Sequence, residues 1–168
     1  MAALDSPTGS FAPAVTMTQD DLRDRVTAYL ASHHTMTVAT MGDAPHAASV
    51  FYVVDGALRL VFISKISSVH GCHIGQEGPV AVTVSEDYGD WELIQGVQLW
   101  GQARLLSGVA RAKGMTLYLT RFPFVHDMLK QPKLAELIAG IGVYQVTPQR
   151  LAFTDNTTGV FGREVLEM

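Results

Sequence analysis

Three β-rich runs that follow one another through short turns constrain the fold of this chain most strongly. The first two runs, residues 36–41 and 46–54, are separated by a short segment that contains Gly, Asp and Pro. The pair Asp55-Gly56, a strong signal for a hairpin turn, then opens the third run, residues 57–64. Because tight turns join strands that run in opposite directions, this region predicts three consecutive antiparallel strands.

Further β-rich runs follow at residues 80–84, 91–106, 142–147 and 150–154. The run from 91 to 106 is long and alternates in polarity. Its Gly96 and Gly101 predict β-bulges, which would bend the strand as closure of a small barrel requires.

Helical patterns separate these runs. Thr18 and Asp21 match a capping box ahead of an amphipathic helix that ends near residue 33. A short helix is predicted over residues 67–76, and a longer helical region, broken by prolines, over residues 109–140. Hairpin-joined strands with helices at their ends, and no repeating βαβ rhythm, predict an α+β fold built on a mainly antiparallel barrel.

Size and charge exclude several classes of function. At 168 residues the chain fits one domain, expected over residues 18–168 after a disordered leader at residues 1–17. The formal net charge of -4 and the lack of clustered Lys and Arg argue against nucleic-acid binding. No apolar run reaches the ~20 residues that span a bilayer, and the start lacks the features of a secretory signal. We therefore expect a cytoplasmic protein without a membrane anchor.

Polar residues gather where the third strand ends and the short helix begins. They are Ser64, Lys65, Ser67, Ser68 and His70. Free backbone N–H groups at a helix start, hydroxyls and cationic side chains together form a cradle that suits a phosphate group. The alternative interpretation is that Ser67 or Ser68 only caps the helix and the rest is solvated surface.

The same short helix invites a metal interpretation, because His70 and His73 could share one of its faces. A metal site normally needs three or four ligands, and the other histidines show no matching pair, so we predict no metal site. Cys72 is the single cysteine, which excludes an intramolecular disulfide. Its place inside the helix predicts a small core residue.

Gln98 is the polar candidate on the long β-rich run. It stands between Val97 and Leu99, so strand geometry points its side chain away from theirs. Its amide offers both a donor and an acceptor and would suit the edge of an isoalloxazine ring, although exposure to solvent also explains it. Trp91 and Trp100 favour packing or an interface over stacking on a flavin.

The C-terminal segment, residues 153–163, is polar and rich in turn formers but carries two phenylalanines, unlike an ordinary frayed terminus. One interpretation is an edge turn capped by Asp155 and Asn156. The other is that a partner orders the segment, with Phe161 as a stacking surface and Arg163 as a cation.

Together these stretches resemble the FMN-binding split barrels related to pyridoxamine-phosphate oxidase, and within them the YhbP-like branch. The resemblance covers residues 20–165. It rests on residues 46–55 (HAASVFYVVD), residues 64–70, Gly96-Val97-Gln98 with Gly101, Arg121-Phe122-Pro123, and residues 153–163 (FTDNTTGVFGR). The RFP and FTDNT…FG stretches are the most specific to the YhbP-like branch.

The resemblance implies a six-stranded split β-barrel that forms a homodimer, with two FMN molecules in grooves between the subunits. Site residues carried over by resemblance fall into three groups. Ser49 and Phe51 would line the flavin groove, and Gln98 would reach the ring. Ser64, Ser68 and His70 would take the phosphate. Asn156, Phe161 and Arg163 would close the groove from the partner subunit.

Departures from the family pattern restrict the chemistry. This chain has Val69-His70 at the place where pyridoxamine-phosphate oxidases share an Arg-Lys pair. It also lacks a C-terminal Arg-x-His, which would bind a pyridoxal phosphate. Pyridoxamine phosphate is therefore not the expected substrate. With fewer cations at the phosphate, Lys65 or Arg163 would supply the missing charge. Heme or a deazaflavin is the alternative ligand.

The expected function is that of an FMN-binding oxidoreductase acting on a small molecule or a reduced nicotinamide, whose substrate the sequence does not identify. The alternative is a flavin-binding or flavin-sensing module without turnover, or a heme-binding protein. The sequence does not separate these functions, because an enzyme and a binding protein need the same groove.

Overall fold

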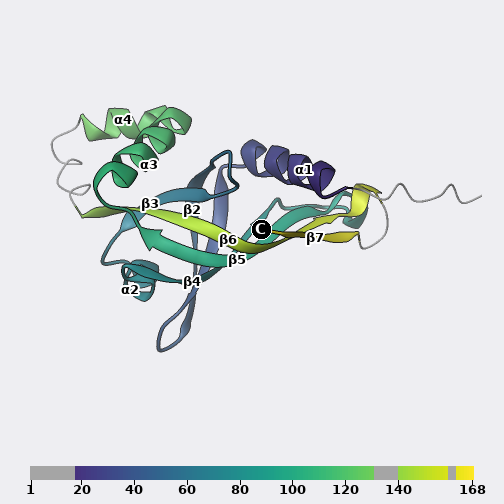
Figure 1. The fold of residues 1–168 in the computed structure, drawn as a ribbon, viewed down its shortest axis with the longest axis horizontal. Helices are drawn as coiled ribbons and strands as arrows, with labels where there is room; N and C mark the ends of the chain where they lie inside the picture. The colour runs from purple at the N-terminus through teal and green to yellow at the C-terminus, as the bar shows by residue number, and fades with distance from the viewer. Residues whose placement is uncertain (1–17, 131–139, 159–161) are drawn as a thin grey trace, which may run out of the picture.

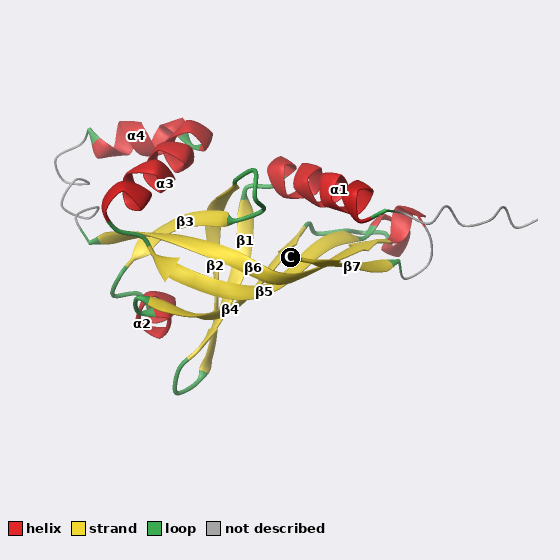
Figure 2. Ribbon diagram, viewed as in Figure 1, coloured by secondary structure: helices red, strands yellow, loops and turns green. Residues whose placement is uncertain are grey.

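Six antiparallel strands close into a barrel in the computed structural model, which describes residues 18–130, 140–158 and 162–168 (Figures 1 and 2). The strands are β1 (Thr35–Met41), β2 (Pro45–Val54), β3 (Leu60–Lys65), β4 (Glu77–Ser85), β5 (Gln95–Leu105) and β6 (Ile141–Asp155). They lie in the order β3-β2-β1-β4-β5-β6, and the pairing of β3 with β6 closes the ring. This confirms the predicted six-stranded antiparallel barrel and its three consecutive strands.

The interior of the barrel is filled by the apolar residues that alternate along each strand. On β5, Val97 and Leu99 are each 1% exposed, whereas Gln98 between them is exposed. Phe62 on β3 and Tyr144 on β6 stack with ring centroids 5.0 Å apart across the closing pair of strands. Because side chains alternate between the two faces of a strand, the same alternation that fills the core sends a second set of residues outward.

Among the described residues, four α-helices flank the barrel: α1 (Gln19–Ser32), α2 (Val69–Ile74), α3 (Gly108–Arg121) and α4 (Pro123–Leu129). The predicted capping box starts α1, since the Thr18 hydroxyl accepts from the amide of Asp21 at 3.1 Å and the Asp21 carboxylate accepts from the amide of Thr18 at 3.2 Å. Its buried face, which includes Leu22, Val26 and Leu30, packs into the barrel core. Figure 1 shows α3 and α4 near one end of β6 and α1 nearer the other.

The two last predicted strands are one continuous strand, β6, and the pairing is irregular at only one of the two glycines predicted to form bulges. Trp100 lies opposite Arg150 and Gly101 lies opposite Pro148, so the register shifts at Gly101 and the extra residue, Gln149, lies on β6 and not on β5. A Cβ atom at Gly101 would come within 2.1 Å of the Thr147 carbonyl oxygen, so only glycine fits there. At Gly96 the pairing is regular on both sides, and the expected bulge there is wrong. The first residues of the predicted long strand instead form a 3-10 helix, η1 (Trp91–Leu93).

The C-terminal segment adds a strand that the sequence pattern did not reveal. After a second 3-10 helix, η2 (Asn156–Thr158), β7 (Arg163–Glu167) pairs with β6 in the same chain. Leu166 is only 2% exposed and belongs to the barrel core. β7 therefore docks on the barrel of its own chain through Leu166 and its pairing with β6.

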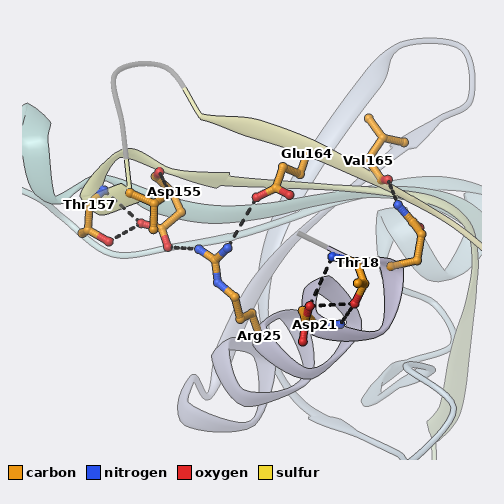
Figure 3. A network of polar contacts seen from close by, with 9 residues as sticks. Thr18, Asp21, Arg25, Asp155, Thr157, Glu164 and Val165 are labelled. Atoms are coloured by element: carbon orange, nitrogen blue, oxygen red, sulfur yellow. Dashed lines mark hydrogen bonds and ion pairs between the residues drawn. The ribbon is translucent and has the colours of Figure 1, made fainter. Parts of the chain in front are cut away.

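A polar network fastens α1 to β6 and β7 (Figure 3). The Arg25 guanidinium donates to the Asp155 carboxylate and lies 3.4 Å from the Glu164 carboxylate. Asp155 also accepts from the hydroxyl of Thr157 at 2.6 Å and from its amide at 3.0 Å. The Gln19 amide donates to the carbonyl of Val165 at 3.3 Å. This network fixes the chain where β6 turns toward β7.

The prediction that Cys72 lies in the core is wrong, because its side chain is exposed. The six-residue helix α2 turns His70 and Ile74 inward and leaves Cys72 on its outer side. The leader expected at residues 1–17 lies outside the described residues. In the described part of the chain, no helix has both the length and the apolar character needed to cross a membrane.

Candidate functional site

The junction between β3 and α2 brings Ser64, Ser68 and His70 together. The Ser64 hydroxyl lies 2.7 Å from Nε2 of His70 and 3.4 Å from the Ser68 hydroxyl. Ser68 is also the N-cap of α2, accepting from the amide of Gly71 at 3.1 Å and donating to the carbonyl of Lys65 at 2.7 Å. Ser68 therefore caps the helix and also belongs to the polar group. Lys65 and Ser67 are exposed beside this group.

His70 is the most enclosed member of this group, with 7% of its surface exposed. Its Nδ1 is buried and has no hydrogen-bond partner. Burial lowers the pKa of His70, and the nearby His46 and His73 lower it further. The His46 ring from β2 lies nearly parallel to the His70 ring, with centroids 5.9 Å apart. Sequence reasoning missed His46, because its proximity to His70 depends on how β2 and β3 curve around α2.

One exposed side of the barrel carries the predicted flavin-groove residues Ser49 and Gln98. Ser49 on β2 pairs with Thr37 on β1, and Gln98 on β5 pairs with Thr83 on β4. Because Thr37 pairs with Thr83, the four residues form one row across four neighbouring strands. The hydroxyls of Thr37 and Ser49 lie 3.5 Å apart. Ser49 and Gln98 therefore stand at the two ends of a single polar row.

A row of small and aromatic residues runs alongside the polar row. The strand register aligns Ala47, Ala39, Ala81 and Trp100. A cavity of about 540 Å³ opens over this row and extends to Met41, Pro45 and Pro79. We call the surface formed by the polar row and the alanine row the outer face. Small side chains make its middle flat, so another molecule could approach the strands closely.

Phe51 follows Ser49 on the same side of β2 but lies in an aromatic cluster beyond the outer face. Its ring meets that of Phe122 at 5.3 Å and that of Phe124 at 6.0 Å, both edge to face. Phe51 and Phe124 remain 45% and 49% exposed, while Phe122 is buried. Phe51 is therefore placed to border a ligand that lies along β2.

Asn156 and Arg163 lie far from the Ser64 group within one chain. Ser64 pairs with Gly142 near the start of β6, whereas Asn156 follows its last residue, Asp155. A strand rises about 3.3 Å per residue, so the path along β6 from one place to the other is roughly 40 Å. Phe161 lies outside the described residues.

The distal end that holds Asn156 and Arg163 is itself well defined. The Asn156 side-chain amide donates to the carbonyl of Trp91 at 2.8 Å, which joins η2 to η1. Its Oδ1 is buried and accepts no hydrogen bond. Arg163 is exposed at the start of β7, opposite Thr154. Trp91 is 52% exposed at the same end, so it does not pack in the core.

Across residues 18–130, 140–158 and 162–168, no three His, Cys, Asp or Glu side chains are grouped so that they could hold a metal ion. His73 instead places Nδ1 3.1 Å from the Thr40 hydroxyl.

Comparison with known proteins identifies the family. No protein-family model matches the chain. A UPF0306 protein of Klebsiella pneumoniae is 34% identical over 139 residues, which cover 82% of this chain and 86% of that protein. The chain belongs to the UPF0306 family. Another UPF0306 protein, YhbP of Escherichia coli O157:H7, is 29% identical over 143 residues, or 84% of this chain and 89% of YhbP.

Solved structures place this UPF0306 protein among the split barrels related to pyridoxamine-phosphate oxidase. A putative pyridoxamine 5'-phosphate oxidase from Listeria innocua matches with a TM-score of 0.59 and 19% identity, over 79% of this chain and 97% of that one. A heme binding protein from Mycobacterium smegmatis matches with a TM-score of 0.65 and 16% identity, over 84% of this chain and 56% of that one. At these identities the likeness concerns the fold, and with the UPF0306 relatives it confirms the resemblance to the YhbP-like branch.

Proposed function

We propose that this UPF0306 protein binds FMN in a groove between two copies of the chain and acts as a flavin-dependent oxidoreductase on a small molecule or a reduced nicotinamide. The observation that carries the proposal is the convergence of Ser64, Ser68 and His70 at the start of α2. Two hydroxyls beside a buried imidazole whose Nδ1 has no partner fit a phosphate group. Lys65, exposed beside them, would add a positive charge.

The rest of the flavin would lie along the barrel strands. Ser49 and Phe51 on β2 would border the ring, and Gln98 on β5 would offer its amide to the ring edge. Bound FMN would supply hydride or electron transfer, and the protein would orient the ring and exclude water from one side of it.

A homodimer would complete the groove. Asn156 and Arg163 lie at the opposite end of β6 from the Ser64 group of the same chain, and a second copy would bring its own Asn156 and Arg163 to that flavin. Such pairing is favoured because Trp100 on the outer face is 42% exposed and Met41, which lines the cavity over that face, is 65% exposed. Two outer faces packed against each other would bury both residues.

The fold neighbours support a flavin or heme ligand. One is described as a putative pyridoxamine 5'-phosphate oxidase and another as a heme binding protein. Val69-His70 in place of an Arg-Lys pair argues against pyridoxamine phosphate as the substrate.

Heme binding is the second candidate function. Its favouring observation is that His46 lines the largely apolar cavity over the alanine row, beside Met41 and Trp100. An imidazole at the wall of an apolar cavity suits an iron porphyrin. A flavin-binding module without turnover, or one that takes a deazaflavin, would use the same groove.

Anaerobic mixing tests the enzymatic proposal. FMN-loaded protein is mixed with NADH or NADPH, and we expect the visible flavin absorbance to disappear faster than that of free FMN under the same conditions. FMN at about one hundred times its dissociation constant should also stabilise the fold by roughly 2.7 kcal/mol. FMN binding without accelerated reduction would support the non-catalytic module, and a thermal shift with hemin but not with FMN would support heme binding.

A further inference from the structure

Three histidines from two elements surround the proposed phosphate site. His70 and His73 lie on α2, and His46 comes from β2. The His46 ring is parallel to that of His70 within 13°, with centroids 5.9 Å apart, and is perpendicular to that of His73 at 6.2 Å. We call these three residues the histidine cluster.

The hydrogen bonding of His70 is incomplete. Its Nε2 lies 2.7 Å from the Ser64 hydroxyl, whereas its buried Nδ1 has no partner. A neutral imidazole carries one N–H donor and one acceptor nitrogen. Either tautomer therefore leaves one buried ring nitrogen unsatisfied, which is unfavourable for a polar group removed from water.

Burial and the neighbouring histidines favour the neutral form of His70. Burial lowers the pKa of His70, and the nearby His46 and His73 lower it further. On β1, the only polar group that contacts the cluster through a hydrogen bond is the Thr40 hydroxyl, 3.1 Å from Nδ1 of His73. Without a nearby anion, an imidazolium at His70 is therefore disfavoured.

The remaining strands around α2 offer no counter-charge to His70. Glu77 on β4 and Arg104 on β5 are exposed and pair with each other at 3.3 Å. Lys65, at the end of β3, is exposed. Burial raises the pKa of Tyr144 on β6, so its phenol stays neutral. Among the described residues, no ion pair joins a carboxylate to any member of the histidine cluster.

We propose that the histidine cluster makes this phosphate site proton-coupled: His70 takes up a proton when the phosphate of a flavin nucleotide binds and loses it when the phosphate leaves. The inference rests on the proposed function. His46 and His73 are positioning residues, because they favour the neutral form of His70 in the absence of the phosphate dianion. Where the pyridoxamine-phosphate oxidases that the chain resembles would have an Arg-Lys pair, Val69-His70 would offer a charge that forms only on binding.

The sign of the pH dependence follows from this coupling. A bound dianion favours the imidazolium form and raises the pKa of His70 above its lowered value in the free protein. Binding therefore takes up a proton, and affinity for the phosphorylated flavin falls as pH rises between the free and the bound pKa. Uptake of one proton corresponds to a tenfold change in the dissociation constant per pH unit. Riboflavin lacks the phosphate and should show no such dependence.

The experiment measures dissociation constants of FMN and riboflavin at several pH values between about 6.5 and 8.5, a range in which a histidine can titrate. For the wild type we expect the FMN constant to rise with pH, approaching tenfold per unit, and the riboflavin constant to stay flat. His70→Gln keeps a polar side chain but cannot be protonated, so its dissociation constant for FMN should not change with pH. It should match that of the wild type only at high pH. His126→Gln, which changes an exposed histidine on α4, should behave as wild type.

A direct readout is the NMR titration of the His70 ring in the wild-type protein. FMN should move its titration to higher pH, and His46→Gln should move it upward in the free protein, because His46 lowers the pKa of His70. The inference would be overturned if the FMN dissociation constant changed with pH equally in His70→Gln and in the wild type. It would also be overturned if the constants of FMN and riboflavin changed equally with pH. Either result would leave the proposed function standing. Failure of FMN to bind at any pH would overturn the proposed function and this inference with it.

Discussion

Ala47→Glu should leave the protein monomeric and largely unable to bind FMN. Ala47 lies in the alanine row of the outer face and is exposed in the single chain, so the substitution leaves the barrel core untouched. In the proposed homodimer a glutamate there would lose its hydration without gaining a partner. Such a penalty amounts to several kcal/mol, and a loss of roughly 4 kcal/mol would weaken dimerisation about 1000-fold.

The measurement is sedimentation velocity at micromolar concentration, with and without FMN. Wild type should sediment as a dimer of 18.2 kDa chains and Ala47→Glu as a monomer. The matched control is Ala57→Glu, which changes an exposed alanine in the turn between β2 and β3. A dimeric Ala47→Glu that still binds FMN would show that the outer face is not the interface.

Asp155→Ala should be the most destabilising single substitution in the polar network of Figure 3. The Asp155 side chain is only 6% exposed, and it accepts from Arg25 and twice from Thr157. Its removal breaks a partly buried ion pair and two hydrogen bonds that Thr157 donates to the carboxylate, which together cost about 3 kcal/mol. Chemical denaturation should therefore show this loss in the free energy of unfolding.

Asp127→Ala provides the control, because its ion pair with Lys130 is exposed and should change the free energy of unfolding much less. The pH dependence adds a second check. Burial alone would raise the pKa of Asp155, but hydrogen bonds from Thr157, Gln95 and Arg25 outweigh it and lower the pKa below 3.8. The contribution of Asp155 is then complete above the unfolded pKa and is lost as pH falls through the folded value. Equal stabilities of wild type and Asp155→Ala at pH 7 would contradict this role of the network.

Local sequence signals predicted the parts of this fold that depend on neighbours in the chain. Asp55-Gly56 marks the hairpin between β2 and β3, and Thr18 with Asp21 marks the start of α1, because both motifs complete their hydrogen bonds within a few residues. The pairing of β7 with β6 has no such signal, since its stability comes from Leu166 and from Arg25 on a distant helix.

In the candidate site, too, the sequence could predict the residues that are grouped by local structure but not those that are brought together by the barrel. The grouping of Ser64, Ser68 and His70 follows from a strand that ends one turn before a helix, so the sequence pattern could suggest it. The alignment of Ser49 with Gln98 depends on the register of four strands, and the stacking of His46 on His70 depends on the curvature of the barrel. Cys72 was misplaced because a six-residue helix has too few turns to reveal its buried face.

In the proposed homodimer, two chains build each flavin groove, with Ser68 and His70 from one chain and Asn156 and Arg163 from the other. Two variants separate these contributions. Ser68→Ala with His70→Ala removes the phosphate side, and Asn156→Ala with Arg163→Ala removes the distal side while keeping β7, which the barrel needs. Each variant alone should lose most of its FMN affinity, and the phosphate-side variant should lose more affinity for FMN than for riboflavin.

The decisive measurement is FMN binding by a mixture of the two variants after subunit exchange. A heterodimer joins both defects in one groove and leaves its other groove intact. If the groove is shared between subunits, we expect one groove of each heterodimer to recover wild-type affinity for FMN. No recovery, with heterodimers demonstrated by native mass spectrometry, would contradict a groove shared between subunits.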